Sequence, residues 1–372
     1  MTRINKITVQ VPNSDSYNIV IGEAILKDLA SHISCFIRSS LFVISDQTVA
    51  DIYLDQVLVQ LPSGTKSFVF KPGEQSKTLD VVLQMYQAFS DANLDRKSLV
   101  INLGGGITTD MGAFAASTYL RGLDFINIST SLEGMVDASV GGKTGVNLDG
   151  KKNQVGMFVQ PKMVIMDIDT LKTLDDRHMI AAMSEVIKHA LVWDQQYLLN
   201  LEQNMSILDL VKRSVEIKAE VVEKDEKEAG LRKLLNFGHT IGHALESWSF
   251  NTANPLLHGE AVSLGIVAES HISMQQGLIR PDELERVEQI LRQYKMITHI
   301  ELPADIDPIV GLLSNDKKIE AGQIKWTLIR GLGRGVVDQS VSDDQILKAL
   351  SYINSSSTDL ALEDIKPQSQ TD

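Results

Sequence analysis

The sequence has only one cysteine, Cys35, among 372 residues. A single cysteine cannot form an internal disulfide, and such scarcity fits a reducing cytoplasm. Its neighbours in Ile33-Ser-Cys-Phe-Ile37 are mostly apolar, which predicts that the thiol packs in the interior and is not a nucleophile. The first residues lack the apolar core of a signal peptide. No apolar run approaches the ~18 residues of a membrane span. We therefore expect a cytoplasmic protein with no membrane partner.

The sequence also lacks an excess of positive charge. Lysine and arginine number 35 against 48 aspartate and glutamate, for a formal net charge of −13. Nucleic acids bind clustered positive charge, so we expect no nucleic-acid partner. A small anionic substrate stays compatible, because one site can be locally basic on an acidic protein.

The length and the 43% hydrophobic content suffice for two domains. Before about residue 175, short β-rich runs alternate with helical patterns, at 40–45, 67–70, 99–103, 125–128 and 163–168. This alternation predicts parallel βαβ units. Later segments have helical spacing of apolar residues, at 179–192, 207–223, 260–276 and 281–294, with one strand at 324–329. We expect an α/β N-terminal domain with a parallel-sheet nucleotide-binding fold (1–177), an all-helical C-terminal domain (178–353) and a disordered tail (354–372).

A glycine run follows the predicted strand 99–103 directly, as Gly104-Gly105-Gly106, and a helical pattern begins at Met111. Glycines at a strand-to-helix turn let the backbone approach a pyrophosphate at the helix N-terminus. The spacing differs from the dinucleotide fingerprint Gly-x-Gly-x-x-Gly. Asp46, at the end of an earlier strand, could accept a hydrogen bond from a ribose. Alternatively, the glycines only form a tight turn and Asp46 caps a helix.

Two lysines, Lys143 and Lys152, stand close to glycines within the segment 141–156. Lysines beside exposed backbone amides are suited to holding an anion. The sequence Gly-Gly-Lys-Thr is not a P-loop, because the earlier glycine and the preceding strand are missing. A kinase or ATPase is therefore not expected. The alternative is that these lysines are solvated on a flexible loop.

Three of the eight histidines fall within twenty residues, as His239, His243 and His258. His239 and His243 have the i, i+4 spacing that places two metal ligands on one helix face. A metalloprotease would have glutamate after the first histidine, where this chain has Thr240. Peptide hydrolysis is therefore disfavoured. Glu185 could add an oxygen ligand if its helix meets the histidines; otherwise it forms a surface ion pair with Lys188.

Taken together, these segments resemble the 3-dehydroquinate synthases, members of the sugar-phosphate cyclases. The matching stretches follow the family order over roughly residues 70–320, at 72–77, 104–110, 119–122, 136–147, 152–158, 184–188, 218–222, 225–232, 236–246, 258–262 and 316–318.

The resemblance implies an enzyme that uses NAD and a divalent metal, Zn²⁺ or Co²⁺. Such an enzyme converts the small anionic sugar phosphate 3-deoxy-D-arabino-heptulosonate 7-phosphate into 3-dehydroquinate and phosphate. The implied steps are transient oxidation by NAD, phosphate elimination, reduction and intramolecular aldol closure. The resemblance also implies a lyase of the shikimate route to the aromatic amino acids, a homodimer, and an active site between the two domains.

The resemblance assigns site residues by position. The implied metal ligands are Glu185, His239 and His258. The implied NAD contacts are Asp46, Glu74, Lys77, Gly105, Gly106, Asp110, Thr130, Ser131, Lys143, Lys152 and Thr173. The implied catalytic and substrate-binding residues are Asp137, Lys188, Lys218, Arg232, Asn236, His243, Lys152, Asn153, Lys317 or Lys318, and Arg121, which reaches the neighbouring subunit's phosphate site.

Some positions depart from the family pattern. Where the family usually has Pro-Thr-Thr-Leu-Leu-Ala, this chain has Ser129-Thr-Ser-Leu-Glu133-Gly134, and Ser184 replaces an alanine. Three other functions remain as alternatives: a sister cyclase acting on another sugar phosphate, an NAD- and metal-dependent alcohol dehydrogenase, and a non-enzymatic binding protein. The basic residues Lys218 and Arg232 argue against a substrate without a carboxylate, and accumulation of NADH would identify a dehydrogenase.

Overall fold

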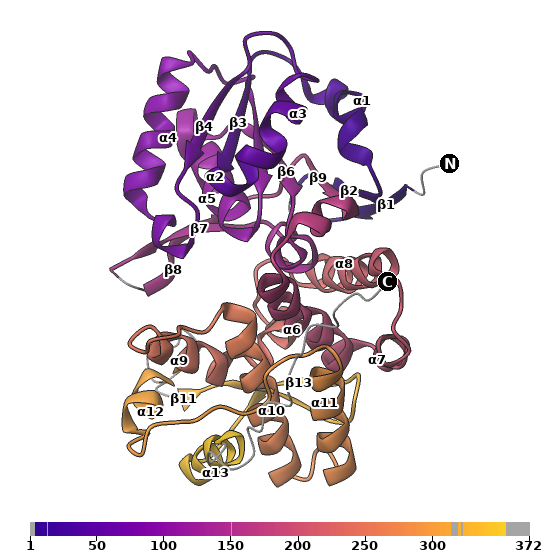
Figure 1. Ribbon diagram of the computed structural model, residues 1–372, viewed down its shortest axis with the longest axis vertical. Helices are drawn as coiled ribbons and strands as arrows, with labels where there is room; N and C mark the ends of the chain where they lie inside the picture. The colour runs from indigo at the N-terminus through magenta and orange to yellow at the C-terminus, as the bar shows by residue number, and fades with distance from the viewer. Residues whose placement is uncertain (1–3, 13, 150, 314–318, 321–322, 355–372) are drawn as a thin grey trace, which may run out of the picture.

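The computed structural model describes residues 4–12, 14–149, 151–313, 319–320 and 323–354. These residues form an upper lobe, from the N-terminal part of the chain, and a lower lobe from the C-terminal part (Figure 1). Lys317, Lys318 and the tail beyond Asn354 lie outside the described residues. Within the described ranges, no helix combines the length and the apolarity needed to cross a bilayer.

A seven-stranded sheet forms the centre of the upper lobe. Its strand order is β1-β2-β9-β6-β5-β3-β4, and every pairing is parallel except the antiparallel pair β1–β2. The bounds are β1 Asn5–Val9, β2 Tyr17–Gly22, β3 Leu41–Asp46, β4 Lys66–Phe70, β5 Leu99–Gly104, β6 Asp124–Ser129 and β9 Met163–Asp167. The predicted parallel sheet is therefore confirmed, and the antiparallel edge of β1 and β2 is an addition.

Helices cover both faces of this sheet, because parallel strands are hydrophobic on both sides. One face packs against η1 (Ile25–Asp28), α1 (Leu29–Ile33) and α3 (Asp55–Leu58). The opposite face packs against α4 (Leu79–Asp91) and α5 (Gly106–Thr118). Shorter turns connect these elements: η2 Ser34–Phe36, α2 Gln47–Val49, η3 Ala50–Leu54, η4 Glu74–Ser76, η5 Tyr119–Arg121, η6 Gly134–Ala138 and η7 Ile168–Thr173.

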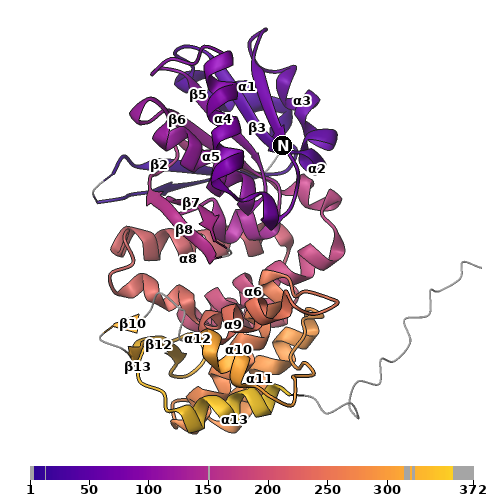
Figure 2. The same cartoon turned by 90° about the vertical axis from the view of Figure 1, so that its left-hand side faces the viewer.

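The lysine-containing segment forms an antiparallel hairpin of β7 (Lys143–Leu148) and β8 (Lys151–Phe158), for which the sequence analysis assigned no strands. Gly145 and Gly156 face each other in its register. A Cβ on Gly156 would lie 2.2 Å from the Thr144 carbonyl oxygen, so close approach of the two strands requires glycine. In both views the hairpin lies on the side of the upper lobe that faces the lower lobe (Figure 1, Figure 2).

The lower lobe is mainly helical. Its helices are α6 Asp176–Trp193, α7 Gln195–Glu202, α8 Ile207–Lys224, α9 His239–Ser249, α10 His258–Gln275, α11 Pro281–Gln293, α12 Asp307–Leu313 and α13 Asp343–Ile353, with the turn η8 Leu231–Asn236. The four predicted helices are confirmed as α6, α8, α10 and α11. Two small hairpins accompany them, β12 (Trp326–Ile329) with β13 (Gly335–Gln339) and β10 (Ile319–Glu320) with β11 (Gln323–Ile324). β12 matches the late strand expected from the sequence.

One hydrophobic core continues from the sheet into the helices. Ile19 and Val164 on β2 and β9 belong to the same buried cluster as the core of α6, α8 and α10. Their neighbours Val20 and Ile165 point to the other face, because side chains alternate along a strand. The helical part is thus packed directly on the sheet, with α8 between the lobes in Figure 1. This packing fixes where the loops of the sheet meet the helices.

Cys35 is exposed, so the prediction that it packs in the interior is wrong. It lies in the turn η2, while the nearby Ile33 is fully buried. On a helical turn, successive residues point in different directions. Apolar neighbours in the sequence therefore did not determine the burial of the thiol.

Candidate active site

A buried carboxylate oxygen stands between two imidazoles where α6, α9 and α10 meet. Oε1 of Glu185 lies 3.4 Å from Nε2 of His239 and 3.7 Å from Nε2 of His258. Within the described part of the chain no hydrogen bond satisfies this oxygen, although Glu185 is only 1% exposed. Ligands about 2.0–2.2 Å from a tetrahedral zinc lie roughly 3.3–3.6 Å from one another. The predicted set of Glu185, His239 and His258 is therefore brought together at a spacing that fits such an ion.

His243 belongs to the same cluster. Its ring centroid lies 5.2 Å from that of His239 and 5.7 Å from that of His258. Nitrogen atoms of the three histidines lie within 4.8 Å of one another. His243 is thus close enough to contact a ligand of the ion or to bind the ion itself.

The crossing of α9 and α10 places these histidines. Gly238 precedes α9 with a φ of +80°, a conformation that favours glycine. A Cβ on Gly265 of α10 would lie 1.9 Å from the Gly238 carbonyl oxygen, so the helices approach closely only because glycine is present. The buried carboxylate of Glu269 accepts hydrogen bonds from the amides of Gly238 (2.6 Å) and Ile241 (3.0 Å). This carboxylate caps α9 from the neighbouring helix and was not identified from the sequence.

Charge governs the protonation of the cluster. Burial opposes charge on His258, but Glu185 and Glu246 outweigh it and raise the pKa of His258 to about 10. Burial and the neighbouring Lys188 hold the pKa of His239 well below its ordinary value. A bound cation would replace the ring proton that this raised pKa favours on His258, because a ligating imidazole must be neutral.

Two buried lysines face acidic partners beside the histidines. Lys188 contacts Oε2 of Glu185, and the side chains of both are at most 2% exposed. The alternative of a surface ion pair is therefore wrong. Lys218 contacts Asp137 of η6, a pairing across the boundary between the lobes. Burial lowers the pKa of Lys218 to about 8, although Asp137 acts in the opposite direction.

A second basic group surrounds Arg232, which is 2% exposed. Its Nη1 donates to the carbonyl oxygens of Gly141 (3.0 Å) and Glu226 (2.6 Å). The Asp225 carboxylate accepts from the amides of Gly230 and Arg232, and so shapes the turn that carries the guanidinium. Nearby, Glu228 contacts Lys143 and accepts from Asn236 (2.7 Å). The structure thus places the predicted NAD contact Lys143 beside predicted substrate contacts.

The glycine loop lies at the carboxyl end of β5 and at the start of α5, as the sequence predicts. A Cβ on Gly105 would lie 2.9 Å from Oγ of Ser131, and one on Gly106 would lie 3.1 Å from Cβ of Ala138. The amide of Thr130 donates to Gly104 (3.0 Å). The loop therefore stands with Thr130 and Ser131 at the strand ends where α/β proteins bind nucleotides.

Asp46 forms a helix cap. Its carboxylate accepts from the amide of Val49 (3.1 Å) and from Oγ1 of Thr108 (3.2 Å). The capping alternative is thus observed, and the side chain still lies at the carboxyl end of β3. Of the other assigned residues, Thr173 shares a hydrogen bond with Tyr53 (2.6 Å).

A polar network attaches the hairpin β7–β8 to the sheet. Nζ of Lys77 lies 2.7 Å from both Asp110 and Asn153. Glu74 accepts from Asn147 (2.8 Å) and lies 3.9 Å from Nζ of Lys152. The network holds five of the assigned residues together, and the segment is a paired hairpin, where the alternative had placed the lysines on a loop.

Arg121 lies apart from these groups in an exposed turn after α5. Leu120 and Arg121 both have positive φ, of 49° and 69°, an uncommon conformation for residues other than glycine. Leu120 is 39% exposed. The turn therefore directs Arg121 to the surface.

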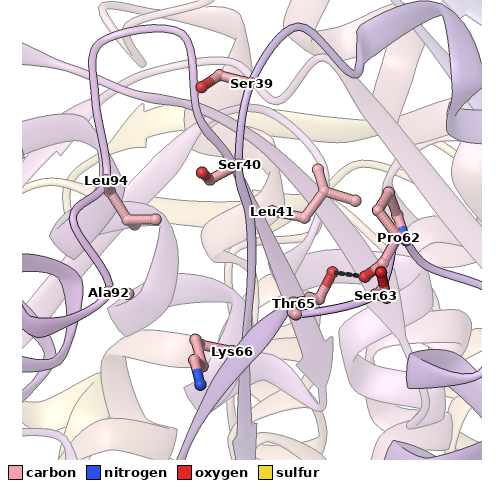
Figure 3. Close-up of a pocket in the computed structure, with 10 residues that line it drawn as sticks. Ser39, Ser40, Leu41, Pro62, Ser63, Thr65, Lys66, Ala92 and Leu94 are labelled. Carbon is pink, nitrogen blue, oxygen red and sulfur yellow. Dashed lines mark hydrogen bonds between the residues drawn. The ribbon is translucent and has the colours of Figure 1, made fainter.

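A separate surface pocket of about 330 Å³ lies at the amino ends of β3 and β4 (Figure 3). Leu41 and Lys66, which begin β3 and β4, line it, and Oγ1 of Thr65 donates to the Pro62 carbonyl oxygen across it (2.7 Å). It contains none of the assigned residues. Ligands of α/β sheets bind at the carboxyl ends of the strands, so this pocket is not the nucleotide site.

Comparison with known proteins adds an independent finding. The 3-dehydroquinate synthase N-terminal family matches residues 67–181, and the 3-dehydroquinate synthase C-terminal family matches residues 182–319. The chain is 40% identical over 356 residues to a 3-dehydroquinate synthase of Rippkaea orientalis, covering 91% of this chain and 96% of that protein.

Solved structures agree on the fold. The chain is similar to 2-epi-5-epi-valiolone synthase from Streptomyces hygroscopicus, solved with NAD⁺ and Zn²⁺ bound. The TM-score is 0.82 and the identity 29%, over 93% of this chain and 98% of that one. A 2-deoxy-scyllo-inosose synthase solved with carbaglucose-6-phosphate, NAD⁺ and Co²⁺ has a TM-score of 0.81 at 22% identity, over 93% and 99% of the two chains.

Proposed function

Because the chain belongs to the 3-dehydroquinate synthase family, we propose that it converts 3-deoxy-D-arabino-heptulosonate 7-phosphate into 3-dehydroquinate and phosphate. It is an NAD- and metal-dependent lyase. The observation that carries this proposal is the unsatisfied oxygen of Glu185 between His239 and His258, with two groups of buried cations beside it. The proposed route is the shikimate pathway to the aromatic amino acids, and the proposed location is the cytoplasm.

The two cofactors have separate binding regions. We assign NAD to residues 1–177, where Gly105, Gly106 and the N-terminus of α5 would hold the pyrophosphate. We assign the metal, as zinc, to Glu185, His239 and His258 within residues 178–353. When bound, NAD accepts and returns a hydride, and the metal polarises the oxygen of the reacting alcohol.

The side chains of the protein bind and orient the substrate. The carboxylate of the substrate pairs with Arg232 and Lys218, two buried cations that meet at the boundary between the lobes. The phosphate is held by Lys152, Asn153 and His243, together with Arg121 from the neighbouring subunit of a homodimer. The exposed turn that carries Arg121 supports this role.

The proton transfer needs little basicity from the protein. The phosphate of the substrate takes the proton from the adjacent carbon as it leaves, and the lysines and histidine keep it in place. Such placement can supply a large part of the rate enhancement. The protein then contributes mainly fixed charges around a reaction that starts and ends with oxidised NAD.

A sister cyclase is the second candidate, because the fold matches 2-epi-5-epi-valiolone synthase at a TM-score of 0.82. A substrate without a carboxylate would form no charge-assisted hydrogen bonds with Arg232 and Lys218. This difference favours the heptulosonate substrate.

The test is phosphate release from 3-deoxy-D-arabino-heptulosonate 7-phosphate by purified protein with NAD and zinc. Release that stops on chelation and leaves no net NADH is expected. Absence of release from protein that still binds NAD and zinc would overturn the assigned substrate in favour of a sister cyclase. Accumulation of NADH would instead identify an alcohol dehydrogenase.

A further inference from the structure

Glu246 lies on the same face of α9 as His239 and His243, at i+7 and i+3 from them. It is 3% exposed, so its negative charge needs partners within the protein. Its environment is therefore informative about the site.

Each oxygen of this carboxylate has a different partner. Oε2 lies 3.5 Å from Nδ1 of His258, and Oε1 lies 2.6 Å from Nζ of Lys152. Glu246 thus contacts a residue of each binding region.

The contact with His258 determines which ring nitrogen faces the metal site. Nε2 of His258 points to Glu185 at 3.7 Å, while Nδ1 points to Glu246. A carboxylate that accepts the Nδ1 proton leaves the lone pair on Nε2 and fixes the plane of the ring. Glu246 is therefore placed to orient the ring for an ion at Glu185 and His239.

The contact with Lys152 crosses the boundary between the lobes. Lys152 belongs to β8 of the upper lobe, and Glu246 to α9 of the lower lobe. Nζ of Lys152 also lies 5.9 Å from the ring centroid of Phe250, just after α9. Among the described residues Nζ of Lys152 forms a second ion pair, with Glu74 at 3.9 Å. Of these two ion-pair partners, Glu246 is the closer one.

We infer that Glu246 is a positioning residue that couples the metal ligand His258 to Lys152, so that one carboxylate sets both the metal affinity and the place of the phosphate-binding lysine. The metal part requires only the observed cluster. The phosphate part rests on the proposed function, because it uses the role assigned there to Lys152.

The decisive variant is Glu246→Gln. An amide has one acceptor oxygen and one donor group, so glutamine can serve His258 or Lys152 but not both. Glu202→Gln is the matched control, since it removes one carboxylate and one ion pair, with Arg286 at 2.6 Å, in the same lobe. Circular dichroism and thermal melting of the metal-free proteins establish that both are folded.

The first measurement is zinc affinity by competition with a chromophoric chelator, together with the visible absorption of the Co²⁺-loaded protein. Loss of such an outer carboxylate costs about 10- to 100-fold in metal affinity. We expect Glu246→Gln to lose that much and to change the Co²⁺ spectrum, while Glu202→Gln matches the parent. A folded Glu246→Gln protein with zinc affinity within about threefold of the parent would overturn the metal part.

The second measurement is the affinity for inorganic phosphate of the zinc- and NAD-loaded proteins. Lys152→Met and Glu246→Gln should each weaken phosphate binding, and the double variant should lose less than the two losses combined, because coupled sites are not additive. If the double variant lost as much phosphate affinity as the two single variants combined, the link to Lys152 would be overturned. Unchanged phosphate affinity in zinc-loaded Glu246→Gln would overturn it as well. A parent that does not bind phosphate would overturn the role proposed for Lys152, and the zinc titration would still decide the metal part.

Discussion

The two regions that meet at the active site differ in the chemical groups they offer a ligand. At its glycine loop, the upper region offers backbone amides and small hydroxyl side chains, at Gly105, Gly106, Thr130 and Ser131, with little room for an added Cβ. The lower region offers buried charged side chains on helix faces, with Glu185 as the centre. A site of the first kind is damaged by added atoms, and a site of the second kind by removed atoms. Substitutions in each region should therefore affect different ligands.

Removing a side chain from the lower region should have the largest effect. We expect His239→Ala to lose zinc binding and more than about a thousandfold of turnover, since a Lewis-acid metal supplies several kcal/mol. NAD affinity should stay within about twofold. Zinc stoichiometry, phosphate release and NAD titration measure the three quantities.

His178→Ala is the control, because this histidine is exposed and pairs only with nearby Asp175 among the ion pairs of the described residues. Full activity of metal-free His239→Ala would contradict the assignment of the metal. A large loss of NAD affinity in the same variant would contradict the separation of the two regions.

The second prediction concerns pH and Lys218. Its ammonium is charged below the lowered pKa of about 8 and neutral above it. The carboxylate of the substrate then loses a partner, so kcat/KM should fall up to tenfold per pH unit above about pH 8, because kcat/KM reports groups of the free enzyme. NAD affinity should stay level from pH 7 to 9.

Lys218→Arg tests this origin, since arginine stays charged over the whole range. In Lys218→Arg, kcat/KM should no longer decrease above pH 8, whatever its value at pH 7. If kcat/KM still decreased in this variant, a group other than Lys218 would be responsible for the pH dependence.

Adding atoms to the upper region should have a smaller effect and on the other ligand. Gly105→Val places carbon atoms toward Oγ of Ser131, which lies 2.9 Å from the position of a Cβ. We expect NAD affinity to fall about tenfold, since a displaced loop loses one or two hydrogen bonds to the cofactor. Zinc affinity should be unchanged. Isothermal titration with each ligand measures both.

Gly311→Ala is the control, as no atom of the described residues lies within 4 Å of the position of its Cβ. Normal NAD affinity in Gly105→Val would show that the cofactor does not approach this backbone. The contrast between the regions would then disappear.

The smallest effect is expected outside both regions. Cys35 is exposed, so Cys35→Ser should change the free energy of unfolding by less than about 0.5 kcal/mol and leave turnover unchanged. Urea unfolding and phosphate release measure this. A buried, packed thiol would cost more, so a large loss of stability would contradict the observed exposure.

The local parts of the architecture could be predicted from the sequence. The five parallel strands and four long helices follow from alternation and helical spacing, which act between near neighbours. The i, i+4 pair of His239 and His243 and the glycine loop before α5 are likewise local patterns. The strands β1 and β2 and the hairpin β7–β8 were not predicted. Their formation depends on pairing with other strands, which leaves only a weak pattern among neighbouring residues of the sequence.

The partners of the charged residues could not be predicted from local patterns. Lys188 and Glu185 have the spacing of a surface pair, and only the packing of α6 against α9 and α10 buries them. Arg232 was identified by resemblance, but its bonds to Gly141 and Glu226 join turns that are 91 and 6 residues away. The cap on α9 by Glu269 also joins two helices, 31 residues apart at Gly238.

The sequence by itself therefore determined the kinds of element, the glycine loop and the residue types that bind a metal, because these depend on interactions along a few residues of chain. Tertiary structure alone decided that Glu246 touches both His258 and Lys152, the latter 94 residues away. It also decided that Cys35 faces solvent. The physical reason is that burial and ion pairing depend on which surfaces pack together, and one continuous core from the sheet into the helices sets that packing here.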